Sequence, residues 1–271
     1  MTSRIARLHS RALVRVSGPD ARPFLHNLLT QDVETLAEGD LRFGALLSPP
    51  GRLLFDLFLF GEGDGVLLDV AAERRDALVQ RLGMYRLRAQ VEVAADDRPV
   101  FASWPEIADG FVADPRAIGL GGRRYGGEAT EAASEDEWRG HELTRGVPGT
   151  ADWPDDKTYP IEANFDLLNG IDFQKGCFVG QETTSRMKRR GTIKSRMLPL
   201  VFEGPAPAVG AEGLNGELRA GEVLSGGDGG AMALLRLDRL EGVLTVEGRT
   251  VTVWWPEESA NQISPNGARA R

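Results

Sequence analysis

The sequence is poor in the residues that build self-contained metal and disulfide sites. Its 271 residues include one cysteine, Cys177, and three histidines. One cysteine excludes an intramolecular disulfide, and it excludes an iron–sulfur cluster held by this chain alone, because such clusters need about four protein ligands. His9, His26 and His141 lie far apart and lack the spacing of a zinc or iron site. We therefore expect no metal site made by this chain alone.

Long apolar runs are also lacking. No stretch reaches the roughly 18 consecutive apolar residues that cross a membrane as a helix. Residues 1–11 contain three arginines but no apolar core of a secretory signal. Together with the single cysteine, which suits a reducing compartment, these absences predict a cytoplasmic protein without membrane contact.

Lysine is scarce, and it is concentrated in one region. All four lysines lie between residues 157 and 194, although the chain has 32 basic residues and a net charge of −8. Between residues 174 and 196, seven cations stand against the single anion Glu182. The acidic balance argues against broad coating of nucleic acid, whereas the basic run at residues 186–196 could still bind RNA phosphates. We therefore look for function around the only thiol.

The apolar pattern predicts an α+β fold in three parts. Residues 1–95 form an N-terminal, ferredoxin-like portion with helices on one face of a sheet. Its strands are expected at 11–17, 41–47, 52–60, 66–70 and 91–93, and its helices at 23–29 and 72–82. Residues 96–194 form a second α+β portion with short strands before about residue 127 and helices at 135–145, 161–168 and 182–190.

The pattern changes at residue 195. Residues 195–255 alternate short apolar segments with Gly-rich turns, which predicts a small closed or sandwich-like β module. Its strands are expected at 197–202, 217–224, 231–235, 244–246 and 250–255. Residues 256–271 have little to pack and are expected to form a flexible tail.

Residues 175–182 read KGCFVGQE and place the only thiol beside a lysine. Because the thiolate is the reactive form of cysteine, the nearby Lys175, Arg186 and Lys188 would favour reactivity. The two glycines of the motif permit left-handed backbone and close approach by a ligand. The alternative is that Cys177 is a small buried residue packed beside Phe178.

Residues 159–191, YPIEANFDLLNGIDFQKGCFVGQETTSRMKRRG, resemble the YgfZ family of folate-binding proteins, a branch of the glycine cleavage system T protein superfamily. Residues 13–21, 24–33, 50–52 and 85–88 are similar to the opening of that family, so that the resemblance covers most of residues 10–200. The motif residues that carry it are Lys175, Gly176, Cys177, Phe178, Gly180, Gln181 and Glu182.

This resemblance implies a glycine cleavage T protein-like fold, with two α+β portions around a central hole and a C-terminal β-barrel. It also implies tetrahydrofolate binding and a role in assembling or repairing iron–sulfur proteins, including enzymes that modify tRNA. The expected partners are folate and iron–sulfur proteins or their assembly machinery. Cys177 is the residue expected to matter most, with Lys175 beside it.

The same resemblance suggests where folate would be bound. Glu162 would face the amine of the pterin, with Asn164 in the same segment and Trp138 packed against the ring. Arg186 or Lys188 would neutralise the glutamate tail. Some members carry a second aromatic residue early in the first strand, where this chain has Arg11.

Three functions remain open on the sequence alone. The one we favour is a folate-dependent accessory factor for iron–sulfur proteins that uses Cys177 to hold or pass a fragment. The second is an aminomethyltransferase that uses tetrahydrofolate, and the third is a non-catalytic RNA- or protein-binding module that works through its basic run.

Overall fold

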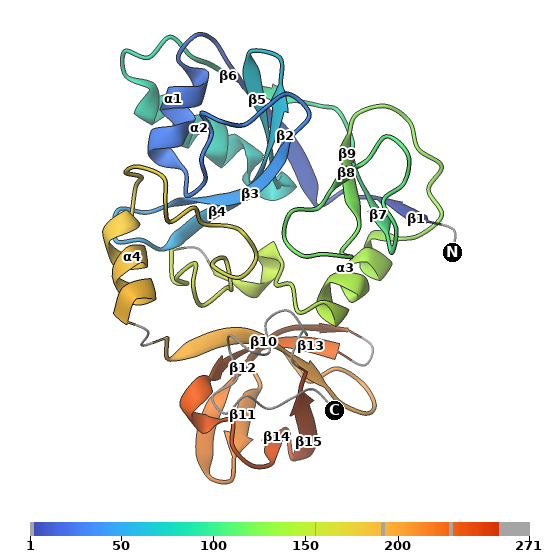
Figure 1. The fold of residues 1–271 in the computed structure, drawn as a ribbon. Helices are drawn as coiled ribbons and strands as arrows, with labels where there is room; N and C mark the ends of the chain where they lie inside the picture. Colours follow the sequence, from blue (N-terminus) through green and yellow to red (C-terminus); the bar gives the residue numbers. More distant parts are fainter. Residues whose placement is uncertain (1–2, 155, 191–192, 228–229, 255–271) are drawn as a thin grey trace. The chain divides into compact units, whose positions relative to one another are not determined.

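The computed structural model describes residues 3–154, 156–190, 193–227 and 230–254 (Figure 1). The chain divides into two compact units, and each is made of two separate stretches of sequence. The first unit contains residues 1–138 and 168–185, and the second contains residues 139–167 and 186–271. The predicted tail at 256–271 lies outside the described residues, and the predicted part boundaries at 95, 194 and 255 stay predictions.

A five-stranded antiparallel sheet forms the centre of the first unit, with the order β3-β4-β5-β2-β6. The five strands predicted for this region are confirmed, although β4, β5 and β6 extend beyond the expected ranges. Their bounds are β2 (Arg11–Ser17), β3 (Leu41–Leu47), β4 (Leu53–Glu62), β5 (Gly65–Ala71) and β6 (Glu92–Asp96).

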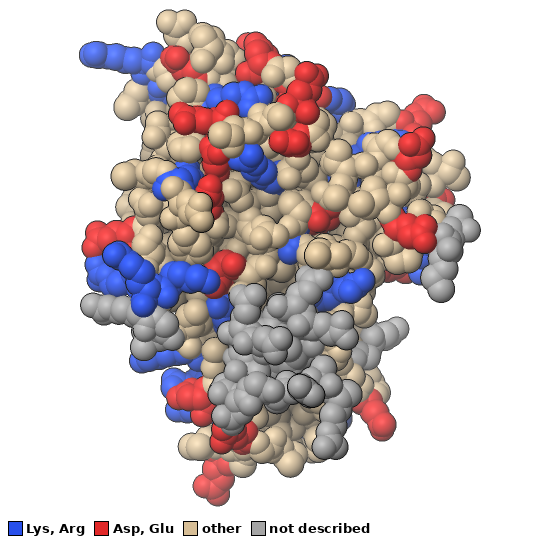
Figure 2. All heavy atoms as spheres, in the orientation of Figure 1, with Lys and Arg blue, Asp and Glu red and all other residues tan. Residues whose placement is uncertain are grey.

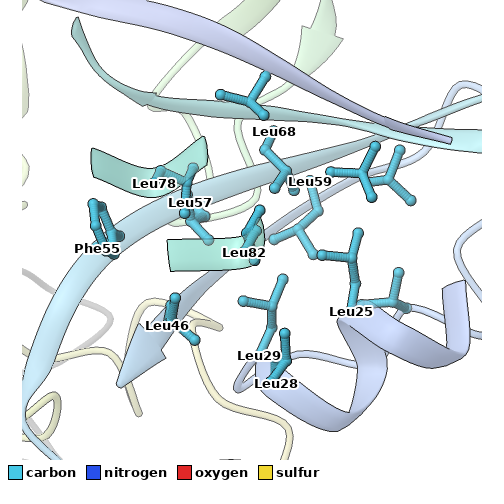
Figure 3. Close-up of a cluster of buried hydrophobic side chains, with 14 of the residues drawn as sticks. Leu25, Leu28, Leu29, Leu46, Phe55, Leu57, Leu59, Leu68, Leu78 and Leu82 are labelled. Carbon is cyan, nitrogen blue, oxygen red and sulfur yellow. The ribbon is translucent and has the colours of Figure 1, made fainter. Parts of the chain in front are cut away.

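Two helices cover one face of this sheet, as the sequence predicts. They are α1 (Ala21–Leu28) and α2 (Arg75–Arg86), and a 3-10 turn at Ala72–Arg74 leads into α2. Leu25 on α1 and Leu78 and Leu82 on α2 are fully buried against the inward side chains of the strands (Figure 3). Each such leucine contributes about 1.5–3 kcal/mol through its removal from water, so this apolar layer fixes both helices on the sheet.

A second, four-stranded sheet completes the first unit, with the order β1-β7-β9-β8. Its strands are β1 (Arg4–Arg7), β7 (Val100–Trp104), β8 (Val112–Ala113) and β9 (Gly122–Tyr125). Strand β1, which the sequence pattern does not predict, pairs with β7 so that Arg4 lies opposite Trp104. Local periodicity could not reveal this strand, because its pairing partner lies about a hundred residues further along the chain.

The second unit contains a closed β-barrel with the order β10-β13-β12-β11-β14-β15, which confirms the predicted β module. Its apolar interior includes Leu198, Val223 and Leu235. The strand β11 was missed because only Leu214 among its four residues is a large apolar side chain. The strands are β10 (Ser195–Val201), β11 (Glu212–Asn215), β12 (Leu218–Gly227), β13 (Gly230–Arg236), β14 (Leu244–Val246) and β15 (Arg249–Val253).

Helices α3 (Glu135–Thr144) and α4 (Gln181–Arg190) confirm two of the three predictions for residues 96–194. The third was wrong, because residues 161–168 form a series of turns. Asn164 has a left-handed φ of 62°, and the amides of Glu162 and Asn164 each donate to the carbonyl three residues before them. An α-helix has negative φ values, and each of its amides donates to the carbonyl four residues before it. Both features therefore show that this apolar segment is not an α-helix.

A buried cluster of charges joins the two sheets of the first unit. Asp69 on β5 is fully buried, and its carboxylate accepts from Arg11 Nε on β2 at 2.6 Å and from Arg123 Nη1 on β9 at 2.9 Å. Arg123 also donates to Asp114 at 3.0 Å. The whole cluster pairs three guanidinium groups with three carboxylates, those of Arg11, Arg116, Arg123, Asp56, Asp69 and Asp114.

The ring of Phe58 on β4 packs against the guanidinium groups of this buried cluster. The guanidinium of Arg123 lies 3.6 Å from the centroid of its ring, and that of Arg116 lies 4.9 Å away. Burial by itself lowers the pKa of Arg11, but the carboxylates of Asp69 and Asp56 outweigh it and raise that pKa. Arg11 therefore has structural partners in the protein interior.

We predict that Asp69→Asn lowers the free energy of unfolding by about 3–5 kcal/mol, because it leaves buried guanidinium charge uncompensated. The matched control is Asp97→Asn, since Asp97 is 91% exposed in its ion pair with Arg75 and should cost less than about 1 kcal/mol. Urea unfolding followed by circular dichroism measures both. Similar losses of unfolding free energy in the two variants would show that the buried ion pairs stabilise the fold no more than an exposed ion pair does.

Candidate functional site

The KGCFVGQE motif runs from an irregular segment of the first unit, residues 169–180, which we call the motif loop, into the first turn of α4. The residues that follow α1 hold its first half. The Thr30 hydroxyl donates to the Gly170 carbonyl at 2.7 Å, and the Asp172 amide donates to the Thr30 carbonyl at 2.9 Å. The Asp172 carboxylate in turn accepts from the amides of Gln174 and Lys175 at 2.7 and 3.1 Å. These bonds fix the loop before it reaches the thiol.

Lys175 makes the central attachment of the motif loop. Its ammonium donates to the carbonyls of His26, of Leu29 at 2.7 Å and of Gln31 at 3.1 Å, at the end of α1. Such carbonyls lack partners within the helix, and a cation is favoured beside them. Burial lowers the pKa of Lys175 to about 8, so the side chain is still mainly an ammonium group near neutral pH.

Lys175 was expected to favour the thiolate form of Cys177. In the structure its ammonium instead binds the carbonyls at the end of α1. Within the described residues, no hydrogen bond joins the Lys175 ammonium to the thiol. The ammonium lies 5.3 Å from the centroid of the Phe178 ring in addition to its three carbonyl partners. Lys175 therefore positions the loop that carries the thiol.

Cys177 is exposed at the tip of the motif loop. The alternative that it is a buried packing residue is therefore wrong. Phe178, directly after it, is buried, and Val179 packs against the leucine-rich core of the first unit. The Gln181 side chain donates to the Gly176 carbonyl at 3.3 Å and closes the tip. The thiol is thus exposed to solvent between Lys175 and Phe178, whose side chains are both held by the first unit.

The two glycines of the motif have different structural roles. Gly180 has a left-handed φ of 81°, and a Cβ there would lie 2.7 Å from the Cα of Gly51 and 2.9 Å from the Ser48 carbonyl. Its absence of a side chain therefore lets the start of α4 approach the turn at residues 48–52. Gly176 has no such φ, and a Cβ there would meet nothing within 4 Å. Gly176 does not use the left-handed backbone that a glycine permits, and this position is open to solvent.

The basic run is only partly a surface feature. Figure 2 shows lysine and arginine side chains gathered over α4, where Arg186, Lys188 and Arg189 are exposed. Lys188 pairs with Asp166 at 3.2 Å. Arg196, at the end of the run, is buried and binds Asp166 at 2.9 Å. Contact of residues 186–196 with RNA stays a prediction.

The residues expected to bind folate are divided between the units. Trp138, in the first unit, is 3% exposed and packs against Trp104 with ring centroids 5.4 Å apart. Asn164, in the second, is buried, donates to the Met197 carbonyl at 2.7 Å and accepts from Arg196 at 3.1 Å. The Trp138 ring is therefore packed in the core, and the Asn164 side chain is hydrogen-bonded within the protein. Both arrangements argue against direct contact with a ligand.

Glu162 is better placed to meet a ligand. It is half-buried, and its carboxylate accepts from the Tyr159 amide at 3.0 Å. Its main-chain carbonyl accepts from the Met197 amide at 2.8 Å, which fixes the backbone to β10. Arg186, in the same unit, is exposed on α4.

Within the described ranges, no group of three His, Cys, Asp or Glu side chains is placed to hold a metal ion. Over the same residues, no helix combines the length and apolar character needed to cross a membrane.

Comparison with known proteins gives matches over almost the whole chain. Residues 194–260 match the family model of the CAF17 C-terminal beta-barrel domain. The chain is 32% identical to proteins of Mus musculus and Homo sapiens, both named "Iron-sulfur cluster assembly factor IBA57, mitochondrial". These alignments cover 92% and 93% of this chain and 85% of each relative. The names place those relatives in mitochondria, and the cytoplasmic location expected for this chain stays a prediction.

Among solved structures, the glycine cleavage system aminomethyltransferase T from Bartonella henselae matches with a TM-score of 0.72 and 17% identity. The match covers 93% of this chain and 84% of that one. The fold expected from the sequence, a glycine cleavage T protein-like fold with a C-terminal β-barrel, is thereby confirmed.

We predict that Gly180→Ala lowers the free energy of unfolding by about 1–3 kcal/mol, because its φ and its contact with Gly51 both exclude a Cβ. Gly176→Ala, four residues away, should change it by less than about 0.5 kcal/mol. Urea unfolding compares the two variants, and hydrogen exchange of the α4 amides shows whether the loss is local. A loss in Gly176→Ala as large as that in Gly180→Ala would contradict this assignment.

Proposed function

The chain belongs to the family of the iron–sulfur cluster assembly factors IBA57, and from this we propose that it takes part in the assembly of iron–sulfur clusters. The observation that carries the proposal is the exposed thiol of Cys177 at the tip of the anchored motif loop. The cluster is cargo here, because one cysteine cannot hold it alone. A partner protein supplies the remaining ligands.

Cys177 serves this role as one thiolate ligand to iron. Binding releases the thiol proton, because the thiolate is the form that binds metal. Lys175, Asp172 and Phe178 hold the loop in place before the partner arrives, which reduces the entropy lost on docking. The lack of a side chain at Gly176 leaves space beside the thiol on the solvent side.

We predict that Cys177→Ala and Cys177→Ser both fail to support iron–sulfur enzyme activity in a host that lacks its own member of the family. The wild-type chain should restore the activity of an iron–sulfur tRNA-modifying enzyme in that host. The control is Ala77→Ser at an exposed position of α2, which should restore it fully. Because Cys177 is exposed, neither variant should lower the melting temperature. Full rescue by Cys177→Ala would show that the thiol is not a required ligand.

We also propose that the second unit contributes to binding tetrahydrofolate. The fold is that of the T protein, and Glu162 offers a fixed carboxylate to the amine and ring N–H of a pterin. Arg186 offers a cation to the glutamate tail. Asn164 and Trp138 do not fit this role, because one is hydrogen-bonded to β10 and the other is packed in the core. When bound, folate would supply one-carbon chemistry, and Glu162 would orient its ring.

We predict that Glu162→Gln weakens binding of 5-formyltetrahydrofolate by about 10- to 100-fold, which corresponds to a charged hydrogen bond of about 1.5–3 kcal/mol. Isothermal titration measures this without any enzyme assay. Glu203→Gln, a substitution at an exposed position elsewhere in the second unit, should leave the Kd unchanged. Absence of binding by the wild-type chain, or equal Kd values for wild type and Glu162→Gln, would refute the assignment.

A further inference from the structure

The C-terminal end of α2 leaves apolar side chains in solvent. The helix packs on the sheet through Leu78 and Leu82, so its other side faces outward. Met84 is 58% exposed and Leu87, where the helix ends, is 88% exposed. Single exposed apolar residues are common, but here two lie three positions apart at one helix end. Leu87 belongs to the segment at residues 85–88 that resembles a known family and that the proposed function leaves unused.

Three arginines surround these apolar residues. Arg81, Arg86 and Arg88 have no carboxylate within 4.0 Å in the part of the chain that the structure describes. Arg86 donates to the Val91 carbonyl at 3.3 Å. Nearby arginines are paired by contrast, since Arg75 binds Asp97 at 2.8 Å. A chain of net charge −8 thus keeps uncompensated positive charge at this place.

The turn after α2 holds this surface in a fixed form. Leu87 has φ 45° and ψ −104°, an unfavourable conformation for a branched side chain. It is maintained by the bond from the Ala89 amide to the Arg86 carbonyl at 2.8 Å. The Gln90 amide also donates to the Asp20 carboxylate ahead of α1 at 2.7 Å. Leu87 thus keeps an unfavourable backbone conformation although its side chain is exposed to solvent.

We propose that Arg81, Met84, Arg86, Leu87 and Arg88, the α2 surface, form a docking site for a protein partner with an acidic surface around an apolar pocket. The charge of the site requires acidic groups on the partner, and Met84 and Leu87 require a pocket that excludes water. Arginine is enriched at such interfaces because its planar guanidinium binds carboxylates with two hydrogen bonds. The surface lies on other elements than the motif loop, so the proposal does not depend on Cys177.

A protein fits this surface better than an anionic membrane. Each arginine near an anionic bilayer contributes about 1 kcal/mol, so three give about 3 kcal/mol, which is too little for stable attachment. Two apolar side chains centred among arginines have instead the composition of a small protein interface, where a few residues supply most of the affinity.

The test uses the full-length chain with a photo-crosslinking amino acid at Gln80, an exposed position one turn before Met84. The crosslinked protein is identified by mass spectrometry, purified and titrated with the unlabelled chain. We expect Arg81→Glu/Arg88→Glu to weaken the Kd at least about tenfold and to remove most of its salt dependence. Met84→Ser/Leu87→Ser should weaken it by about tenfold as well.

Two matched controls lie in the same unit. Arg7→Glu reverses an exposed arginine elsewhere, and Ile118→Ser removes an 83% exposed apolar side chain. Both should keep the Kd within about twofold. The surface variants should keep the wild-type melting temperature, because Met84, Leu87 and Arg88 are exposed and the half-buried Arg81 has no carboxylate partner within the described residues.

Several results would overturn the proposal. One is the absence of a crosslinked protein, and another is an identified partner whose Kd does not change in either surface variant. Binding to phosphatidylglycerol vesicles that Arg81→Glu/Arg88→Glu abolishes would assign the surface to membranes. Sedimentation that shows a dimer dissociated by the same variant would assign it to a second copy of this chain. If Cys177→Ala fully restored iron–sulfur enzyme activity in the complementation, the role of the thiol would be refuted. None of the binding measurements on the α2 surface would change.

Discussion

The first unit depends on the compensation of one buried carboxylate. Asp69 lies on the central part of the five-stranded sheet, where an unpaired charge would be strongly unfavourable. Arg11 compensates it from the neighbouring strand and Arg123 from the second sheet. Because both are needed to satisfy the carboxylate, the two sheets are held in one arrangement. Apolar contacts place α1: Leu25 and its neighbours pack on the same five-stranded sheet and so fix the helix to which the motif loop is attached.

The presentation of Cys177 is one consequence of this organisation. The motif loop returns to the first unit after an excursion through residues 139–167, and it is fixed there by Lys175 on the carbonyls that end α1. A cation at a helix C-terminus is a local and short-range contact, but it holds together segments separated by more than 140 residues. The exposed thiol therefore depends on the fold of the N-terminal half, and an isolated motif peptide would lack this support.

Positive charge has three different roles in this chain. Arg11 and Arg196 are buried with carboxylates and stabilise the interior of their units. Lys175 is half-buried and positions a loop. Arg81 and Arg88 have no carboxylate partner within the described residues and are available to another molecule. Composition counts all five as cations, so net charge alone could not assign any of these roles.

The sequence by itself determined the strands and helices with clear apolar periodicity, the presence of a small C-terminal β module and the position of the motif. Alternating or helical spacing depends on neighbours in the chain, which is why β2, α1 and α2 were predictable. Only the tertiary structure decided the pairing of β1, the turns at residues 161–168 and the targets of Lys175 and Arg196. These depend on atoms far away in the sequence, where hydrogen bonding and burial outweigh local preference.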